Sequence, residues 1–204
     1  GKTVIGYLWS RVRYYKPWIV TSLVVPFVDR EIFSAPGMSV ISFDIPEDDV
    51  LSRYYFAAKS MGLDYVVRLT GDCPLVGLEE LDAMISLCTG GYDYASNRHP
   101  VEWAPSGLDV EVFSFDALRE AHFCTLHQGA AGLDREHVTS FMYRELRSCS
   151  YKPAYNYNPL AKMSIDTKED YTRVVKVGQA VFAKYGISHT NSNVLDTYRE
   201  LYAR

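Results

Sequence analysis

Two aspartates stand where a carboxylate could hold a divalent cation. Asp72 follows an apolar run that ends in Thr70-Gly71, and Asp166 follows a second apolar segment. In an open α/β sheet, ligands bind beyond the carboxyl ends of the strands, and Mg²⁺ is typically held by one or two carboxylates together with substrate phosphates. The pair could therefore share one Mg²⁺ and orient an attack on phosphorus. Alternatively, each aspartate caps the helix or turn that follows it.

Other polar residues could complete such a site, and each also has a simpler interpretation. Asp109 and Glu111 lie on one face of an alternating segment, which suits a wet cleft or a plain exposed sheet face. The run Asn97-Arg98-His99 could contact a ligand or form an ordinary polar loop. The tetrad Asp134-Arg135-Glu136-His137 is most simply a solvated first helical turn.

Composition narrows the class of protein. The chain has 204 residues and a net charge of -4, which predicts one globular domain over residues 1–204 and argues against nucleic-acid binding. Its four cysteines form no CxxC pair, which is typical of reduced thiols in a cytoplasm. We find no apolar run of membrane-spanning length and no signal-peptide pattern. The cysteines and histidines also lack the spacing of a catalytic triad, so nucleophilic catalysis by the protein is not expected.

Hydrophobic periodicity predicts the elements that would position these residues. Strands are expected over 18–25, 38–43, 65–69, 92–96, 108–113 and 162–165. Helices are expected over 3–15, 29–35, 50–61, 79–88, 115–122, 134–146 and 194–202, with another after a Thr167–Asp170 capping box. The alternation predicts an α/β fold with a mostly parallel central sheet flanked by helices.

Six segments, taken in order, carry a family resemblance. They are 47–55, 66–75, 92–97, 107–113, 135–139 and 165–170. Together they resemble the cytidylyltransferases of the spore coat polysaccharide type, relatives of the CMP-Kdo and CMP-sialic acid synthetases. The resemblance implies a nucleotide-diphospho-sugar transferase (Rossmann-like) fold. It also implies transfer of a cytidylyl group from CTP to an acidic or modified sugar for surface polysaccharide, with release of pyrophosphate.

The same resemblance implies roles for individual residues. Asp72 and Asp166 would be the catalytic Mg²⁺ ligands. Asp49, Arg53 and Arg68 would lie near the nucleotide, and the sugar side would be lined by Asn97, Asp109, Glu111, Arg135 and His137. The sugar itself would supply the attacking oxygen. A cytoplasmic homodimer is expected.

The sequence also departs from the family's pattern. The family opens with a strand and a loop of Gly, Arg and Lys that cradles the triphosphate, whereas Gly1–Ile5 resembles the segment after that loop. The first strand and the phosphate loop are therefore expected to be missing from this sequence. Two alternatives stay open. One is a sugar-1-phosphate nucleotidyltransferase or glycosyltransferase of the same fold, and the other is a non-catalytic domain that binds a nucleotide sugar.

Overall fold

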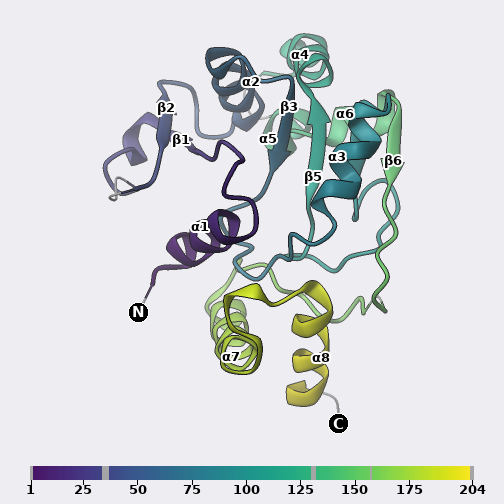
Figure 1. Cartoon of the computed structure of the whole chain (residues 1–204). Coiled ribbons are helices and arrows are strands. Elements are labelled where there is room, and N and C mark those ends of the chain that lie inside the picture. The colour runs from purple at the N-terminus through teal and green to yellow at the C-terminus, as the bar shows by residue number, and fades with distance from the viewer. Residues whose placement is uncertain (1, 34–36, 130–131, 157, 203–204) are drawn as a thin grey trace.

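The computed structural model describes residues 2–33, 37–129, 132–156 and 158–202 (Figure 1). Its strands are β1 (Leu23–Pro26), β2 (Val40–Phe43), β3 (Tyr65–Arg68), β4 (Tyr94–Ser96), β5 (Glu111–Ser114) and β6 (Ser148–Ser150). Its α-helices are α1 (Val4–Tyr15), α2 (Val50–Met61), α3 (Leu81–Thr89), α4 (Phe115–Cys124), α5 (Leu133–His137), α6 (Ser140–Glu145), α7 (Lys168–Tyr185) and α8 (Asn191–Tyr202). Short 3-10 turns span Phe27–Asp29, Leu126–Gln128 and Gly186–Ser188. Part of the predicted 29–35 helix lies outside the described residues.

The strands form two sheets with helices around them, as Figure 1 shows. β1 pairs with β2 in parallel, and the larger sheet has the order β3-β5-β4-β6. Within it β5 runs antiparallel to both neighbours, while β4 and β6 pair in parallel. The predicted α/β architecture is confirmed, and β5 is the strand that departs from the parallel arrangement. No helix in the described ranges is long and apolar enough to cross a membrane.

Several helix ends follow directly from capping residues. Asp49 caps α2 by accepting a hydrogen bond from the Ser52 N–H, and Gly62 ends this helix with a left-handed φ of 62°. At α7, Thr167 and Asp170 form the predicted capping box. These ends agree with the sequence expectation because each depends on contacts within one helical turn.

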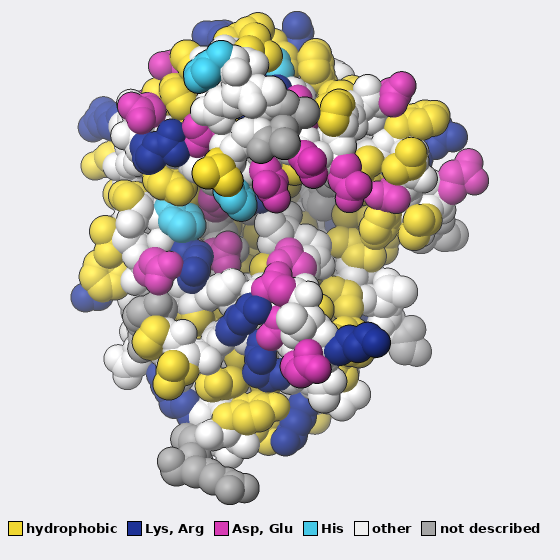
Figure 2. Space-filling view, turned by 180° about the vertical axis from the view of Figure 1, so that it is seen from behind, with side chains coloured by type: hydrophobic (Ala, Val, Ile, Leu, Met, Phe, Trp, Pro, Cys, Tyr) yellow, Lys and Arg dark blue, Asp and Glu magenta, His cyan; other side chains and the backbone are white. Residues whose placement is uncertain are grey.

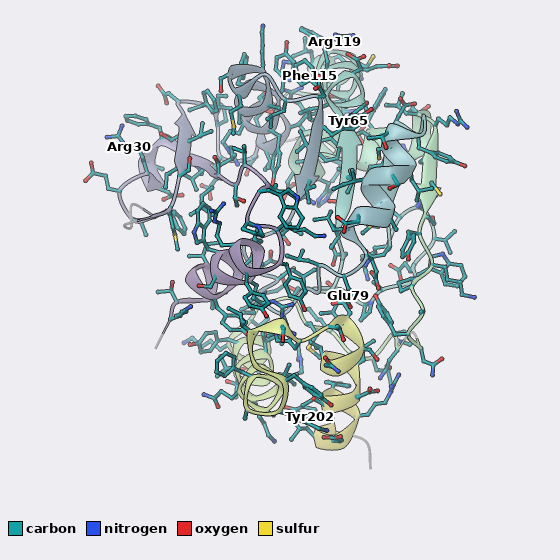
Figure 3. All side chains as sticks on the ribbon, viewed as in Figure 1. Arg30, Tyr65, Glu79, Phe115, Arg119 and Tyr202 are labelled. Atoms are coloured by element: carbon teal, nitrogen blue, oxygen red, sulfur yellow. The ribbon has the colours of Figure 1, made fainter. Side chains whose placement is uncertain are left out.

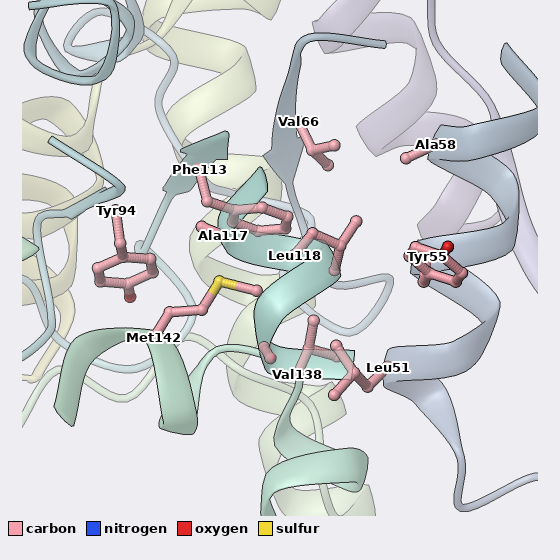
Figure 4. Close-up of a cluster of buried hydrophobic side chains, with 11 residues drawn as sticks. Leu51, Tyr55, Ala58, Val66, Tyr94, Phe113, Ala117, Leu118, Val138 and Met142 are labelled. Carbon is pink, nitrogen blue, oxygen red and sulfur yellow. The ribbon is translucent and has the colours of Figure 1, made fainter. Parts of the chain in front are cut away.

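A buried cluster fixes the helices above the larger sheet. Figure 4 shows Phe113 of β5 and Val66 of β3 packed between α2, α4 and α6, with Tyr55 and Met142 among their neighbours. Burial of such side chains contributes about 1.5–3 kcal/mol each. The cluster therefore holds β3 and β5 rigidly at the edge where polar side chains begin.

The predicted helix over 134–146 is wrong in its middle. The chain instead forms α5 and α6, separated at Val138, whose φ is 65° and ψ is -55°. The His137 carbonyl accepts a hydrogen bond from the Thr139 N–H at 2.6 Å across this residue. Such a turn is rare and strained for a β-branched residue. Val138 is fully buried in the core cluster despite this backbone conformation.

The predicted strand over 162–165 is also wrong, and β6 was not predicted. Residues 162–165 are assigned to no strand and join no sheet ladder. Their backbone bonds go instead to two loops, through Met163 N–H to the Ser106 carbonyl and Ile165 N–H to the Asp72 carbonyl. The segment therefore lies against loops and serves to bring them together.

A large apolar cavity separates the two sheets. It has a volume of about 770 Å³, and β1 and β3 line it from opposite sides. Helix α1 contributes Leu8 and helix α2 contributes Ala58 to its walls. In the described ranges, β1 and β3 each pair along one edge only. Residues of both strands line this cavity.

Candidate active site

Three loops meet at the end of the larger sheet. The turn after β3 contains Asp72, the loop before β5 contains Gly107 and Asp109, and the 162–166 segment joins both. Gly107 has a φ of 92°, and a Cβ there would lie 2.1 Å from the Met163 carbonyl carbon. Only glycine permits this backbone approach. The loop junction therefore depends on one residue without a side chain.

This junction brings the backbone at Asp72 against the backbone next to Asp166. The Ile165 N–H donates to the Asp72 carbonyl at 3.1 Å, so Asp166 is the next residue after that contact. Asp72 is partly exposed, and the Asp166 side chain is 57% exposed. Neither caps the helix that follows it, because Glu80 takes the N-cap position of α3 and Thr167 takes that of α7. The interpretation of either aspartate as a cap for the following helix is therefore wrong.

Asp109 lies close to the same junction. Burial and the charges of Asp109 and Asp72 together raise the pKa of the Cys73 thiol. Burial and the nearby Glu111 also raise the pKa of Asp109, whose Oδ1 accepts from the Gly107 N–H at 2.9 Å. The cluster is thus acidic and partly withdrawn from water. Such surroundings favour a bound cation.

The donor set fits Mg²⁺ rather than a metal held by the protein alone. No group of three or more His, Cys, Asp or Glu side chains in the described part of the chain could hold a metal ion. Two carboxylates are nevertheless enough for Mg²⁺, which keeps waters and takes substrate phosphates as further ligands. Asp72 and Asp166 are therefore suited to a cation that arrives with its substrate.

Glu111 is buried, which corrects the expectation of a wet strand face. Its side chain pairs with Arg68 of the neighbouring strand and accepts hydrogen bonds from Tyr94 at 2.8 Å and Thr139 at 2.6 Å. Burial alone would raise the pKa of Glu111, but the Arg68 charge and these hydrogen bonds outweigh it and lower the pKa. With 4% of its surface exposed, Glu111 orients Arg68 and does not face solvent.

Asp49 and Arg135 contact each other. The family resemblance had implied that Asp49 lies near the nucleotide and that Arg135 lines the sugar side. Arg135 donates to Asp49 Oδ2 at 2.8 Å and also contacts Ser52 and the His122 carbonyl. Both partners are buried, so the interpretation of this part of the tetrad as a solvated turn is wrong. The pair joins α2 to α5. In this structure the two residues contact each other.

Arg53 and His137 differ in their surroundings. Arg53 is buried and donates to the carbonyls of Pro46 and Glu47 at 2.7 Å each. It therefore shapes the loop before α2. His137 is exposed at the end of α5, directly before the strained turn. Of these two candidates, His137 is the one whose side chain is open to a ligand.

Comparison with known proteins identifies the family. The cytidylyltransferase family profile matches residues 29–201. The chain belongs to the cytidylyltransferase family. It is 34% identical to the uncharacterized protein MJ1063 of Methanocaldococcus jannaschii and 30% identical to the spore coat polysaccharide biosynthesis protein SpsF of Bacillus subtilis, each over 146 residues. Both alignments cover 69% of this chain and 56% of the relative, so the chain spans little more than half the length of these relatives.

Solved structures give the same fold. A cytidylyltransferase from Leptospira borgpetersenii superposes with a TM-score of 0.79 at 22% identity, covering 98% of this chain and 84% of that one. A 4-diphosphocytidyl-2C-methyl-D-erythritol synthase from Anaerococcus prevotii gives a TM-score of 0.57 at 13% identity, with 88% and 90% covered. The chain therefore has the fold that the resemblance implied.

Asn97 is buried and links three segments of the chain through its side-chain hydrogen bonds. Its amide donates to Glu80 Oε2 at 3.2 Å and to the Leu108 carbonyl at 3.1 Å, and it accepts from the Val110 N–H at 2.9 Å. Because it is fully buried, its side chain is not open to a sugar. Its position fixes the strand that leads from Asp109 into β5.

The buried carboxylate of Glu80, which accepts a hydrogen bond from Asn97, predicts a pH dependence of the protein's stability. Burial, with a smaller contribution from Glu79, raises the pKa of Glu80 from 4.5 to about 7. Glu79 itself lies beside the start of α8 and accepts from the Asn191 N–H at 2.7 Å (Figure 3). The folded state therefore binds a proton that the unfolded state releases above pH 4.5. We expect stability to fall by up to about 3 kcal/mol as pH rises from 4.5 to 7, since one pKa unit corresponds to about 1.4 kcal/mol.

Urea unfolding at pH 5 and pH 8 tests this expectation. Glu80→Gln removes the titrating group and keeps the hydrogen-bonding shape, so its loss of stability between the two pH values should be smaller. Glu120→Gln, at an exposed position of α4, is the control and should behave as the wild type. Equal pH dependence in all three proteins would contradict the assignment to Glu80.

Sequence reasoning missed some residues that build the site. Gly107 and Ser106 hold the 162–166 segment, and Lys162 contacts Asp166 directly. The available signal was the spacing of four residues between Lys162 and Asp166. Because residues 162–165 were predicted to form a strand, no contact between these two side chains was expected. Surface charge gave little help. Figure 2 shows acidic and basic side chains intermixed over one face, with no broad basic patch there.

Proposed function

We propose that this protein transfers a cytidylyl group from CTP to a sugar acceptor, with Mg²⁺ bound by Asp72 and Asp166. An acceptor oxygen forms a bond to the α-phosphorus of CTP, the bond from that phosphorus to the oxygen bridging the α- and β-phosphates breaks, and pyrophosphate leaves. The observation that carries the proposal is the hydrogen bond from Ile165 N–H to the Asp72 carbonyl, since it joins the two loops that bear the carboxylates. Family membership supports the choice of a cytidylyl group.

In this proposal the protein positions groups rather than attacking them. Bound Mg²⁺ would neutralise phosphate charge and orient the displacement. Asp72 and Asp166 would fix the cation, while Asp109 lies beside them where a sugar hydroxyl could be bound. Glu111 would hold Arg68 in place at the end of β3. No protein nucleophile is required, because the acceptor supplies the attacking oxygen.

The acceptor and the setting are also proposals. The name of the SpsF relative refers to spore coat polysaccharide biosynthesis, which supports an acidic or modified sugar destined for a surface polysaccharide. We propose a cytoplasmic homodimer. Large apolar side chains that are exposed before and after β1, including Trp18, Val28 and Ile32, support self-association.

The test is pyrophosphate release from nucleoside triphosphates with Mg²⁺ and a panel of acidic and neutral sugars. The 204-residue chain should be assayed at several Mg²⁺ concentrations. We expect release with CTP, little with ATP or UTP, and none when EDTA removes the cation. Release of a nucleoside diphosphate from a nucleotide sugar would instead indicate a glycosyltransferase. Binding of a nucleotide sugar without turnover would indicate a non-catalytic domain.

A further inference from the structure

We propose that Lys162 binds a phosphate group of the nucleotide. Before nucleotide and cation bind, its ammonium pairs with Asp166 and Asp170 instead. The inference rests on the proposed function, because it takes Asp166 as a ligand of the cation that accompanies CTP. It adds a substrate-binding role for a side chain that neither the sequence motifs nor the comparisons assign.

The contacts of Lys162 place its charge beside the candidate metal ligand. Its Nζ donates to Asp166 Oδ2 at 2.6 Å and to Asp170 Oδ2 at 2.7 Å. The Lys162 side chain is 41% exposed. As an ordinary lysine, it carries a positive charge at neutral pH. The pair with Asp166 joins two exposed side chains, and such pairs contribute little to stability, so the ammonium can leave Asp166 at little cost.

Asp170 does not depend on Lys162. Its Oδ2 also accepts from the backbone N–H groups of Asp166 and Thr167, and Arg173 pairs with its Oδ1. Arg173 donates from Nε to the Lys162 carbonyl at 3.0 Å as well. The Lys162 backbone is therefore anchored, while its side chain can move without leaving Asp170 unpaired.

Binding of a divalent cation at Asp166 would weaken the ion pair between Lys162 and Asp166. An ammonium in contact with the same carboxylate is repelled by the added positive charge. Lysine carries its charge on a flexible four-carbon stem, and a phosphate bound at this site would offer charge-assisted hydrogen bonds in exchange. Since Lys162 already contacts Asp166, little movement is needed to reach such a phosphate.

The three arginines among the predicted site residues already have partners and are largely withdrawn from solvent. Arg68 pairs with Glu111, and Arg135 pairs with Asp49. Arg53 donates to two backbone carbonyls. Lys162 differs from these three because its side chain is substantially exposed and its buried partner keeps other donors. These differences favour Lys162 as the cation that changes partners.

The experiment compares the wild type with Lys162→Met, Lys162→Arg and the control Lys168→Met. Lys168 is an exposed lysine two residues beyond Asp166, so its variant removes a nearby charge without touching the ion pair. Calorimetry would measure binding of Mg²⁺ alone and of CTP with Mg²⁺, and pyrophosphate release would give KM and kcat. Urea unfolding would confirm that each variant is folded.

We expect Lys162→Met to bind Mg²⁺ alone about threefold to tenfold more tightly, because a competing charge is gone. Its affinity for CTP should fall about 10- to 100-fold, as for a lost charge-assisted hydrogen bond. Lys162→Arg should lie between it and the wild type, and Lys168→Met should match the wild type. If the wild type binds Mg²⁺ and turns over while Lys162→Met behaves identically, this inference is overturned alone. If the wild type neither binds Mg²⁺ nor releases pyrophosphate, the proposed function fails and this inference fails with it.

Discussion

Replacing Asp72 by asparagine is expected to lower kcat/KM for pyrophosphate release roughly 100- to 1,000-fold, an effect typical of removing one preorganised electrostatic contact. Stability should change by less than about 1 kcal/mol, because Asp72 is partly exposed and does not cap α3. Steady-state assays and urea unfolding of the same preparation measure the two effects. The variant separates a role in chemistry from a role in the turn.

Asp116→Asn is a matched control for this prediction. Asp116 is an exposed aspartate in the first turn of α4, paired with Arg119. Its variant should keep wild-type activity and nearly wild-type stability. An Asp72→Asn protein that is fully active but about 1 kcal/mol less stable would show that Asp72 only stabilises its turn.

The second large effect is expected at the buried Asp49–Arg135 pair. Arg135→Ala should destabilise the folded state by about 3–5 kcal/mol, because it leaves the Asp49 carboxylate buried without its charged partner. The double variant with Asp49→Ala should lose less than the sum of the two single variants, since the residues are in direct contact. Urea unfolding at pH 7 gives all three values.

The pH dependence of this pair has a defined sign. Burial alone would raise the pKa of Asp49, but hydrogen bonds from Arg135 and Ser52 outweigh it and lower the pKa below 3.8. The stabilisation is therefore present above pH 3.8 and is lost as pH falls through the lower folded-state value. Arg119→Ala, which breaks an exposed pair, should cost less than about 1 kcal/mol. Loss of activity in Arg135→Ala with unchanged stability would instead indicate direct substrate binding.

Local signals in the sequence were enough to predict much of the fold. The predicted bounds of α2 and the predicted capping box of α7 agree with the structure, because a helix cap works through bonds within one turn. Long-range effects were not visible. Val138, at the break between α5 and α6, is buried against distant helices, and the 162–166 segment bonds to loops far away in the sequence.

The candidate site was predicted unevenly for the same reason. Asp72 and Asp166 were chosen because each follows an apolar run, and the structure brings their loops together. Charge patterns were less informative, because a charged residue near a motif can face a substrate or another residue. Arg68 and Glu111 lie opposite each other on paired strands, but a sequence does not show which strands are neighbours.

The open edges of β1 and β3 have a consequence for how this chain behaves at high concentration. Each edge presents backbone donors and acceptors with no strand partner in the described ranges, next to an apolar cavity. Such edges are templates for strands of other molecules. While the gap between β1 and β3 is unfilled, their edges can therefore pair with strands of other molecules. A strand placed in the gap would prevent this association, protect solubility and join the two sheets.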